Sequence, residues 1–389
     1  MAFDRVIGQE TPRERLMDAL KQGRLAHAYL LHGPPGTGAE TLAVELAKAV
    51  NCLEGDGEPC QVCRSCRKIA ALQHPDVHVY PPASSSKTTR GTDTGDNDED
   101  EPEDRSVRMD ARTERRITLT GRLAEDPYTP LDLNKNDFIS IDDIRELRQE
   151  ASAKPYEGRR KVTIVVSADR MNIPASNALL KTLEEPPGAL LLLLTTHRPH
   201  QLLPTILSRC QPVHLARLEE AEIRETLVTR FGTPPPKAAL AARQADGSLS
   251  LAILRSAPEG ERLYEKAAAF LESVHADNAL GLFDAVEQLA AAHKEQPVVE
   301  RLIDIMLRYY RDLFLLIVDP SITDIIHTDR EAWLRQTAAR LAPEQVETGI
   351  RALEAAKRDI ACNAHLQLAL TVLALRLRSL PAKTVQTVR

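Results

Sequence analysis

The residues with the clearest chemical pattern lie in a glycine-rich loop near the start of this 389-residue chain. The run Gly33-Pro34-Pro35-Gly36-Thr37-Gly38 has the glycine spacing of the phosphate-binding pattern G-x-x-x-x-G-K-[ST]. In that pattern the lysine reaches the β- and γ-phosphates and the hydroxyl binds Mg²⁺. Here Ala39 and Glu40 take those two positions, so the cation is lost and a negative charge faces the polyanion. The loop therefore has the backbone pattern of a nucleotide site, and we expect it not to bind ATP.

A second nucleotide-handling position is also altered. The run from Lys161 to Asp169 begins with an apolar, β-branched segment that predicts a buried parallel strand. Working P-loop ATPases carry Asp, and often Glu, at the end of this strand, to bind Mg²⁺ and orient water. Val166 and Ser167 stand there instead. Asp169 is either a displaced metal ligand or an ordinary N-cap or loop residue. We favour the ordinary role, because metal geometry tolerates little displacement.

Four closely spaced cysteines predict a metal site. In a cytosolic chain such thiols are typical of tetrahedral Zn²⁺ ligands rather than disulfides, and four protein ligands leave no open position for catalysis. His74 and His78 are competing ligands, and four unrelated thiols are the remaining alternative. Cys210 and Cys362 stand apart and are interpreted as buried apolar residues. The predicted structural zinc ligands are Cys52, Cys60, Cys63 and Cys66.

Composition limits the classes of protein to which the chain can belong. Its length predicts two to four domains, and a hydrophobic content of 43% is enough for real cores. We find no apolar run long enough to cross a membrane and no signal-peptide pattern, so we expect a cytoplasmic protein. The formal net charge of −6 argues against a general nucleic-acid-binding protein.

The elements that must position these residues change type along the chain. From Ala28 to Thr196, predicted strands alternate with helices, which is the pattern of a doubly wound parallel sheet. After Pro212 the pattern predicts helices only, first a small three-helix unit and then a separate helical domain. The last of them, Asn363–Leu377, is apolar on more than one face, which implies burial against neighbouring helices or against other subunits.

Residues 83 to about 135 interrupt the alternation. The stretch from Asp93 to Asp104 contains eight carboxylates and no basic residue. Such a segment buries too little apolar surface to offset its ordering entropy. We therefore expect a disordered acidic insertion, with a regulatory segment that docks on a basic partner or mimics nucleic acid as the alternative.

Three strings carry a family resemblance. They are Ile7-Gly8-Gln9 with Arg24–Leu30, then Asn177–Pro187 (NALLKTLEEPP), then Leu203–Cys210 (LPTILSRC). With the cysteine cluster, they resemble the bacterial clamp-loader AAA+ subunits of DNA polymerase III. The resemblance spans about residues 3–82 and 138–215.

The resemblance implies an α/β fold, an AAA+ P-loop NTPase-like parallel sheet domain followed by two helical domains. The implied boundaries are 1–215 for the AAA+ RecA-like domain with its zinc module at 51–67. A three-helix lid domain follows at 216–272 and a helical collar, or oligomerisation, domain at 273–389.

Within the family, two subunit types are candidates: the ATP-hydrolysing gamma/tau motor and the non-hydrolysing delta-prime stator. The altered loop and strand end favour the stator. So does Ser250, which follows Gly247-Ser248-Leu249 where motor subunits carry an arginine that contacts nucleotide. Thr195 and Thr196 keep the polar position that senses the γ-phosphate in the family. The motor subunit remains the alternative.

Arg209 is the catalytic residue that the resemblance implies. In the family, the arginine of Ser-Arg-Cys acts in trans as a finger on ATP held by the neighbouring subunit, because its planar fork spreads over phosphate oxygens. The alternative is a structural arginine paired with a carboxylate. The implied partners are the gamma/tau and delta subunits in a hetero-pentamer, with primed DNA and the sliding clamp contacted through the complex. No ATPase activity of its own is implied, only membership of the DNA polymerase III holoenzyme, a nucleotidyltransferase.

A stand-alone DNA-binding AAA+ protein is a third interpretation. Aromatic residues make up only 4% of the chain, and we find no basic stripe interleaved with aromatics. This interpretation is therefore ranked last.

Overall fold

The computed structural model divides the chain into two compact units. It describes residues 3, 5–55, 57–84, 103–131, 133–276, 280–292, 296–362 and 364–378. One unit comprises residues 1–226 and 247–251, and the other comprises 227–246 and 252–389. The boundary between the two units passes through α8 and α10 and does not coincide with the domain limits expected from the sequence. The three expected domains stay a prediction.

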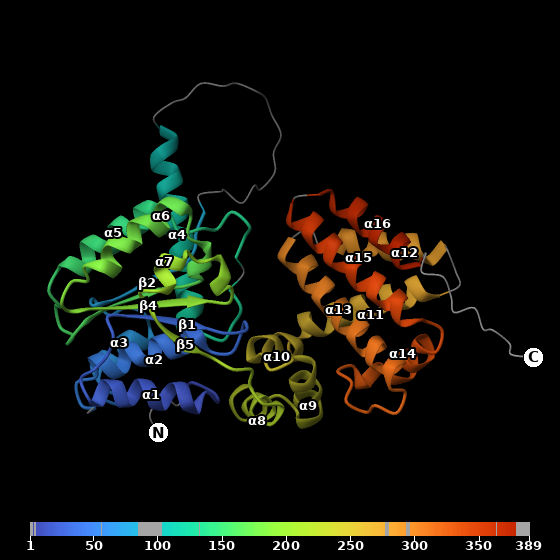
Figure 1. The fold of residues 1–389 in the computed structure, drawn as a ribbon, viewed down its shortest axis with the longest axis horizontal. Coiled ribbons are helices and arrows are strands. Elements are labelled where there is room, and N and C mark those ends of the chain that lie inside the picture. Colours follow the sequence, from blue (N-terminus) through green and yellow to red (C-terminus); the bar gives the residue numbers. More distant parts are fainter. Residues whose placement is uncertain are drawn as a thin grey trace, which may run out of the picture. The chain divides into compact units, whose positions relative to one another are not determined.

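The first unit contains the sheet (Figure 1). Its elements in chain order are α1 Glu10–Lys21, β1 Ala28–His32, α2 Ala39–Asn51, α3 Arg64–Ala70, β2 Val77–Tyr80, α4 Glu103–Glu125, α5 Ile141–Ser152, β3 Lys161–Val165, a 3-10 turn Ala168–Arg170, α6 Ile173–Glu184, β4 Leu190–Thr196, a 3-10 turn Pro199–Gln201, α7 Pro204–Leu207, β5 Gln211–His214 and α8 Glu220–Phe231.

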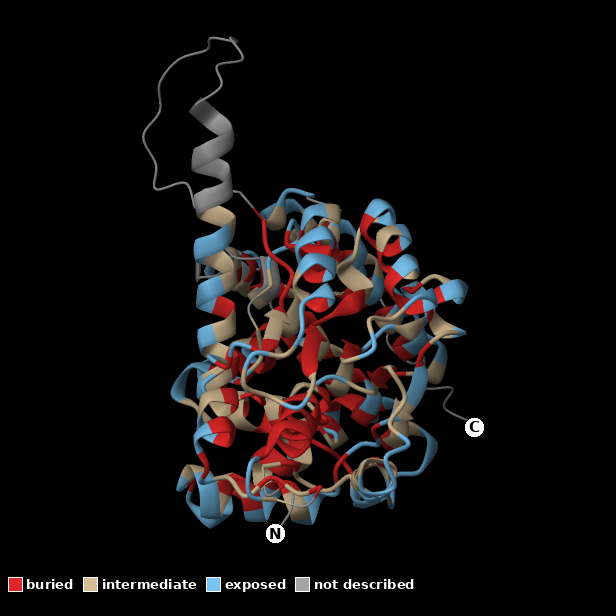
Figure 2. Cartoon of the chain, turned by 90° about the vertical axis from the view of Figure 1, so that its left-hand side faces the viewer, coloured by how far each residue is buried: buried red, intermediate tan, exposed pale blue. Residues whose placement is uncertain are grey.

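The described strands form one five-stranded parallel sheet in the order β2-β3-β4-β1-β5. Both faces are covered, with α1, α2 and α3 on one side and α5, α6 and α7 on the other (Figure 1). The leucine run of β4 shows why. Leu191 and Leu193 belong to the core under α2, whereas Leu192 and Leu194 belong to the core under α5 and α6. Figure 2 shows the strands buried between helices whose outer faces are exposed. The expected parallel α/β sheet is confirmed.

The second unit is helical. Its elements are α9 Pro235–Gln244, α10 Leu249–Ser256, α11 Pro258–His275, α12 Leu280–Ala292, α13 Gln296–Val318, a 3-10 turn Thr328–Arg330, α14 Glu331–Ala338, α15 Pro343–Ala361 and α16 Leu366–Arg378. One core joins α11 to α16 and includes Phe270, Tyr309 and Leu373. The helical C-terminal part was expected, but α11 was missed, although Pro258 at its start and Glu261 in its first turn are ordinary helix signals.

The second half of the insertion is ordered, so the expectation of disorder is wrong for its described residues. Leu119 and Leu123 of α4 are buried, and so is Tyr128 just after the helix. Three arginines on one side of α4 supply the polar anchors: Arg112 binds Asp143, Arg115 binds Asp137, and Arg116 binds Glu146. These few apolar and charged contacts offset the ordering entropy. Residues 85–102, with most of the acidic run, lie outside the described residues.

Some smaller expectations also change. The short strand expected at Phe138–Ile141 forms only isolated bridges, and Ile141 already begins α5. Cys210 is buried as expected, but Cys362 is exposed after the end of α15. Within the described residues, no helix is long and apolar enough to cross a membrane.

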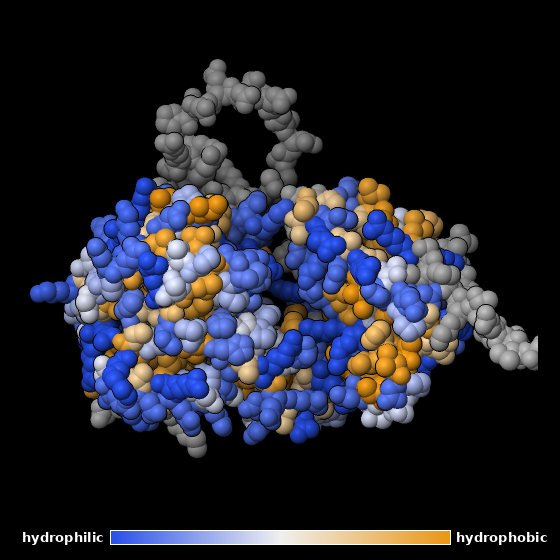
Figure 3. Space-filling view, viewed as in Figure 1, coloured by the Kyte–Doolittle hydropathy of each residue, from blue (hydrophilic) through white to orange (hydrophobic). Residues whose placement is uncertain are grey.

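The space-filling view shows apolar patches on the otherwise hydrophilic surface of each unit (Figure 3). On the helical unit the large exposed apolar side chains are Phe283, Phe314, Val318, Leu368, Val372 and Leu375.

Candidate functional site

The glycine-rich loop joins β1 to α2 at the carboxyl edge of the sheet. Gly36 and Gly38 have φ of 76° and 101°, which is the left-handed region that favours glycine. The Thr37 hydroxyl donates to the carbonyl of Pro34 at 2.8 Å, and the carbonyl of Gly38 accepts the Leu42 amide of α2. The loop therefore has the turn and the helix N-terminus that a phosphate site requires.

Tyr128 fills the space over this loop. An added Cβ at Gly38 would lie 2.7 Å from the Tyr128 hydroxyl. That hydroxyl accepts the Ile7 amide at 2.9 Å, and the side chain is 1% exposed. Sequence reasoning missed this residue. The available signal was that Tyr128 is the only tyrosine in the insertion of residues 83 to about 135, which was expected to be disordered.

The segment 247–251 closes the other side of the loop. The Leu249 amide donates to the carbonyl of Gly36 at 3.0 Å, and the Ser250 hydroxyl donates to the carbonyl of Tyr128. An added Cβ at Gly36 would lie 2.7 Å from Cβ of Ser250. Ser250 thus packs directly on the phosphate loop.

The acidic residues near the loop are held by threonines at the end of β4. Glu40 accepts the Thr195 hydroxyl at 2.9 Å, and that same hydroxyl oxygen accepts the Ser167 amide at 3.2 Å. Asp169 accepts the Thr196 hydroxyl at 2.7 Å. Val166 and Ser167 follow β3 as expected and bring no carboxylate. Asp169 serves as an acceptor for Thr196 and not as the N-cap of a helix, because it lies inside the 3-10 turn.

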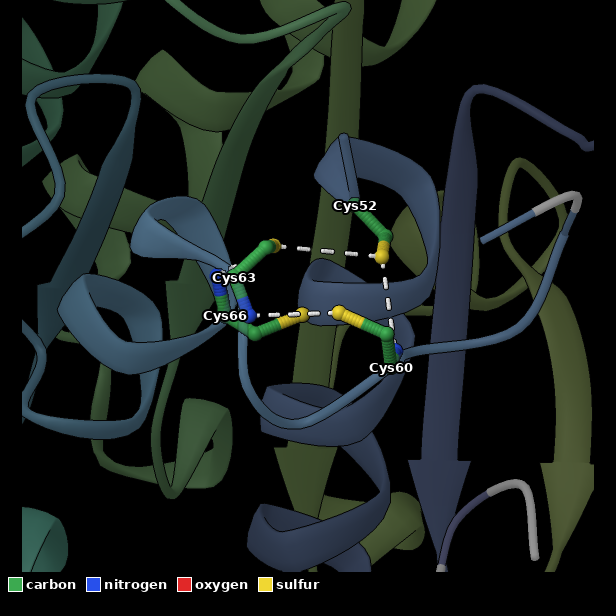
Figure 4. Close-up of side chains that lie close together, drawn as sticks. All are labelled: Cys52, Cys60, Cys63 and Cys66. Carbon is green, nitrogen blue, oxygen red and sulfur yellow. Dashed lines mark hydrogen bonds between the residues drawn. The ribbon is translucent and has the colours of Figure 1, made fainter. Parts of the chain in front are cut away.

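The four predicted zinc ligands converge. Cys52 follows α2, Cys60 lies in the connecting loop, Cys63 caps α3, and Cys66 lies in its first turn. Their Sγ atoms point toward one another and all lie within 4.8 Å (Figure 4). A tetrahedral ion with Zn–S bonds of about 2.3 Å requires sulfurs about 3.8 Å apart, and Cys52 and Cys63 are 4.0 Å apart. The set therefore fits a metal ion.

Backbone amides of the loop favour the thiolate form at two of the four cysteines, Cys52 and Cys63, whereas burial and hydrogen bonds to neighbouring thiols raise the pKa of Cys60 and of Cys66. The Gly55 and Cys60 amides donate to Sγ of Cys52 at 3.1 and 3.3 Å, and the Cys66 amide donates to Sγ of Cys63 at 3.4 Å. Burial raises the pKa of Cys63, but amide and thiol hydrogen bonds outweigh it and bring this pKa to about 6. Ionised sulfur is the form that binds metal.

The competing histidines are occupied elsewhere. His74 is buried, with Nε2 3.1 Å from the Ser65 hydroxyl and Nδ1 accepting the Asp76 amide. His78 pairs with Glu150 at 2.9 Å. Neither belongs to the cluster of potential metal ligands among the described residues.

Arg209 lies between α7 and β5. Its guanidinium is 2.8 Å from Glu184, at the end of α6, and donates to the carbonyl of Thr205 at 3.0 Å. Its side chain is about one-third exposed. Glu184 is thus the carboxylate partner that a purely structural arginine would need. The Arg209 side chain nevertheless remains partly exposed to solvent.

Comparison with known proteins decides the family. The family model described as DNA polymerase III, delta subunit, matches residues 8–219, which is more than half of the chain. The chain belongs to this family. The resemblance that the three strings and the cysteine cluster carried is confirmed.

The chain resembles more than one DNA polymerase III subunit. It is 27% identical to subunit delta′ of Bacillus subtilis over 352 residues, covering 90% of this chain and 91% of that protein. It is 30% identical to subunit tau of Escherichia coli over 295 residues, covering 73% of this chain but only 38% of the relative. Among solved structures, a gamma-subunit-related protein of Thermotoga maritima is 18% identical with a TM-score of 0.47, covering 93% of this chain and 98% of that one.

Proposed function

We propose that this chain is the non-hydrolysing, delta-prime-type stator of a DNA polymerase III clamp loader. In that role it helps to load the sliding clamp onto primed DNA without turning over ATP itself. The gamma/tau relatives leave the motor subunit as the competing function. A motor must bind and hydrolyse ATP. Whether the glycine-rich loop of residues 33–38, here called the phosphate loop, can hold ATP therefore distinguishes the two functions.

The observation that carries the proposal is a phosphate loop that is filled by the chain itself. Tyr128 and Ser250 pack against Gly38 and Gly36, where a nucleotide would approach the backbone. Glu40 adds a negative charge, and Ala39 supplies no cation. Near a protein surface, one unit-charge contact at 4 Å is worth roughly 4 kcal/mol. Replacing attraction by repulsion therefore opposes nucleotide binding even where space is made for it.

The test is a calorimetric ATP titration of the full chain and two variants. We expect no binding by the wild type at millimolar ATP. Ala39→Lys with Glu40→Thr restores the charge pattern but leaves Tyr128 in place, so it should bind ATP weakly. Adding Tyr128→Ala should strengthen that binding. Neither variant should hydrolyse ATP, because Val166 and Ser167 still replace the carboxylates. A wild-type Kd below about 100 μM, or about 5.5 kcal/mol of affinity, would favour the motor.

We also propose that the ion at the cysteine cluster is one structural Zn²⁺. Four thiolates close its coordination sphere, so the ion would organise the loop between α2 and α3 and supply no reacting position. The buried pair of Glu45 and Lys48 on α2 is tied to this loop through Gln61, whose side chain hydrogen-bonds both residues at 2.7 Å. The module is thus anchored to α2 by a polar network as well as by its ligands.

The proposed partners are the gamma/tau and delta subunits of a hetero-pentamer. Arg209 would act as a finger on ATP held by the neighbouring motor, after exchanging Glu184 for phosphate oxygens. The collar would join the partners through exposed apolar positions such as Leu368, Val372 and Leu375, which lie four and three residues apart on α16.

A further inference from the structure

The loop between α5 and β3 holds an aromatic side chain out in solvent. Tyr156 is 85% exposed. The amides of Tyr156, Glu157 and Gly158 all donate to the carboxylate of Asp76, at 2.7, 2.8 and 2.7 Å. Asp76 is fully buried and immediately precedes β2. One buried acceptor therefore fixes three consecutive backbone positions around the exposed ring.

A second buried side chain fixes the rest of the loop. Asn51, the last residue of α2, accepts the amides of Arg159 and Arg160 at 2.8 and 3.0 Å and donates to the carbonyl of Arg160 at 3.0 Å. The ring of Tyr156 plays no part in these bonds. The loop is thus rigid without the ring, and a ring on a rigid support loses little conformational entropy when it binds.

Cations from a distant part of the sequence border this loop. Glu157 binds Arg64 at 3.2 Å and Lys68 at 2.7 Å, so α3 lies directly beside it. Residues 62–68 and 154–160 together contain one acidic residue, Glu157, already paired with two of the cations. Their basic residues are Arg64, Arg67, Lys68, Lys154, Arg159 and Arg160. Some 90 residues separate the two segments along the chain, so the sequence shows no continuous pattern of basic and aromatic residues.

We propose that this surface, formed by residues 62–68 and 154–160, binds single-stranded nucleic acid. The cations would contact successive phosphates, and a base would stack on Tyr156. An acidic peptide would meet the same cations, but a projecting, rigidly supported ring favours a base with a flat face. The loop precedes β3 at the amino edge of the sheet, whereas the phosphate loop follows β1 at the carboxyl edge. The proposal is therefore independent of nucleotide binding.

Fluorescence anisotropy of a labelled oligothymidine, titrated with the full chain in low salt, tests the role of the ring. Tyr156→Ala should weaken binding about tenfold, since stacking on an aromatic side chain is worth about 1–3 kcal/mol per base. Tyr156→Phe keeps the ring and should bind as the wild type does. Ile173→Ala removes another highly exposed apolar side chain, on α6, and serves as the matched control.

Salt dependence tests the cations. Arg159→Gln should reduce the slope of log affinity against log salt by about 0.7, the value for one phosphate contact on a single strand. Arg224→Gln, an exposed arginine on α8, should leave the slope unchanged. Absence of binding by the wild type, or an affinity of Tyr156→Ala equal to that of the wild type, overturns the proposal. Displacement of the oligonucleotide by polyglutamate at equal charge concentration, with no effect of Tyr156→Ala on polyglutamate affinity, would identify an acidic-polymer site instead.

Discussion

If the chain is the stator proposed above, Arg209 is the side chain that would distinguish an active stator from a purely architectural one. In the reconstituted complex, Arg209→Ala should leave assembly intact and slow hydrolysis at the one motor site that faces this subunit. An arginine finger is worth about 10³–10⁵-fold in rate at the site it completes. Total ATPase activity should fall only in part, because the other motor sites are unaffected. Clamp loading should fall more, because it would need turnover at all the sites together. Arg209→Lys should rescue little, because a point charge cannot reproduce the planar fork.

Glu184 supplies the matched control for that experiment. Glu184→Gln breaks the ion pair but keeps the arginine. If Arg209 is a finger, this variant should load clamps at least as well as the wild type. Equal defects in Glu184→Gln and Arg209→Ala would show that the pair itself is what the complex needs.

His275 in α11 predicts how the helical unit responds to acid. Burial lowers the pKa of His275 to about 4, and its Nε2 lies 3.1 Å from the Tyr310 hydroxyl. Because the folded pKa lies below the unfolded value of about 6.5, the unfolded chain binds the proton first as pH falls. Stability is thus fully present above pH 6.5 and declines toward pH 4, by at most about 1.4 kcal/mol per pH unit from this group.

Urea unfolding can follow this effect through the single tryptophan, Trp333, whose ring centre is 6.2 Å from that of His275. His275→Gln should flatten the pH dependence between pH 6.5 and 4. His365→Gln, on an exposed histidine, should leave it as in the wild type. An unchanged slope in His275→Gln would mean that this histidine takes up its proton in the folded state as readily as in the unfolded state.

Among the structural elements, the cysteine-containing loop between α2 and α3 is the one whose order should depend most on a bound metal ion. Cys63→Ser should abolish the zinc content measured by elemental analysis, and hydrogen exchange should increase in α3 and its preceding loop. The sheet should survive, because the cluster lies outside the strands and their cores. Cys362→Ser removes an exposed thiol and should leave both measurements unchanged. Zinc-free wild-type protein would reject the metal assignment.

At the scale of the whole molecule, α16 has two apolar faces. Leu370, Leu373 and Leu377 are buried in the core of the helical unit, while Leu368 and Leu375 are about half or more exposed. Leu368→Glu with Leu375→Glu should therefore leave the fold intact and weaken assembly with the gamma/tau and delta subunits, as measured by size-exclusion chromatography. Gln367→Glu adds charge at an exposed polar position of the same helix and should assemble normally. Normal assembly of the double variant would place the collar contact elsewhere.

The sequence by itself determined the features that depend on local pattern. The apolar run of β4 predicted a doubly covered parallel strand, because both faces of such a strand must be buried. The cysteine spacing predicted the four-thiol cluster, because ligands in short turns converge on one point. The replacement of Lys and Ser/Thr by Ala39 and Glu40 was visible in the same way, since a motif names the residues that its chemistry needs.

Only the tertiary structure decided what fills the phosphate loop and what surrounds Tyr156. Tyr128 comes from a segment whose composition predicted disorder, because composition does not show that a few buried leucines and three anchored arginines suffice to order a helix. Asp76 and Asn51 are unremarkable polar residues in sequence, yet they hold five backbone amides of one loop. These contacts join residues about 80 to 120 positions apart. Pairing across such distances is set by how the elements pack, which no local periodicity or spacing records.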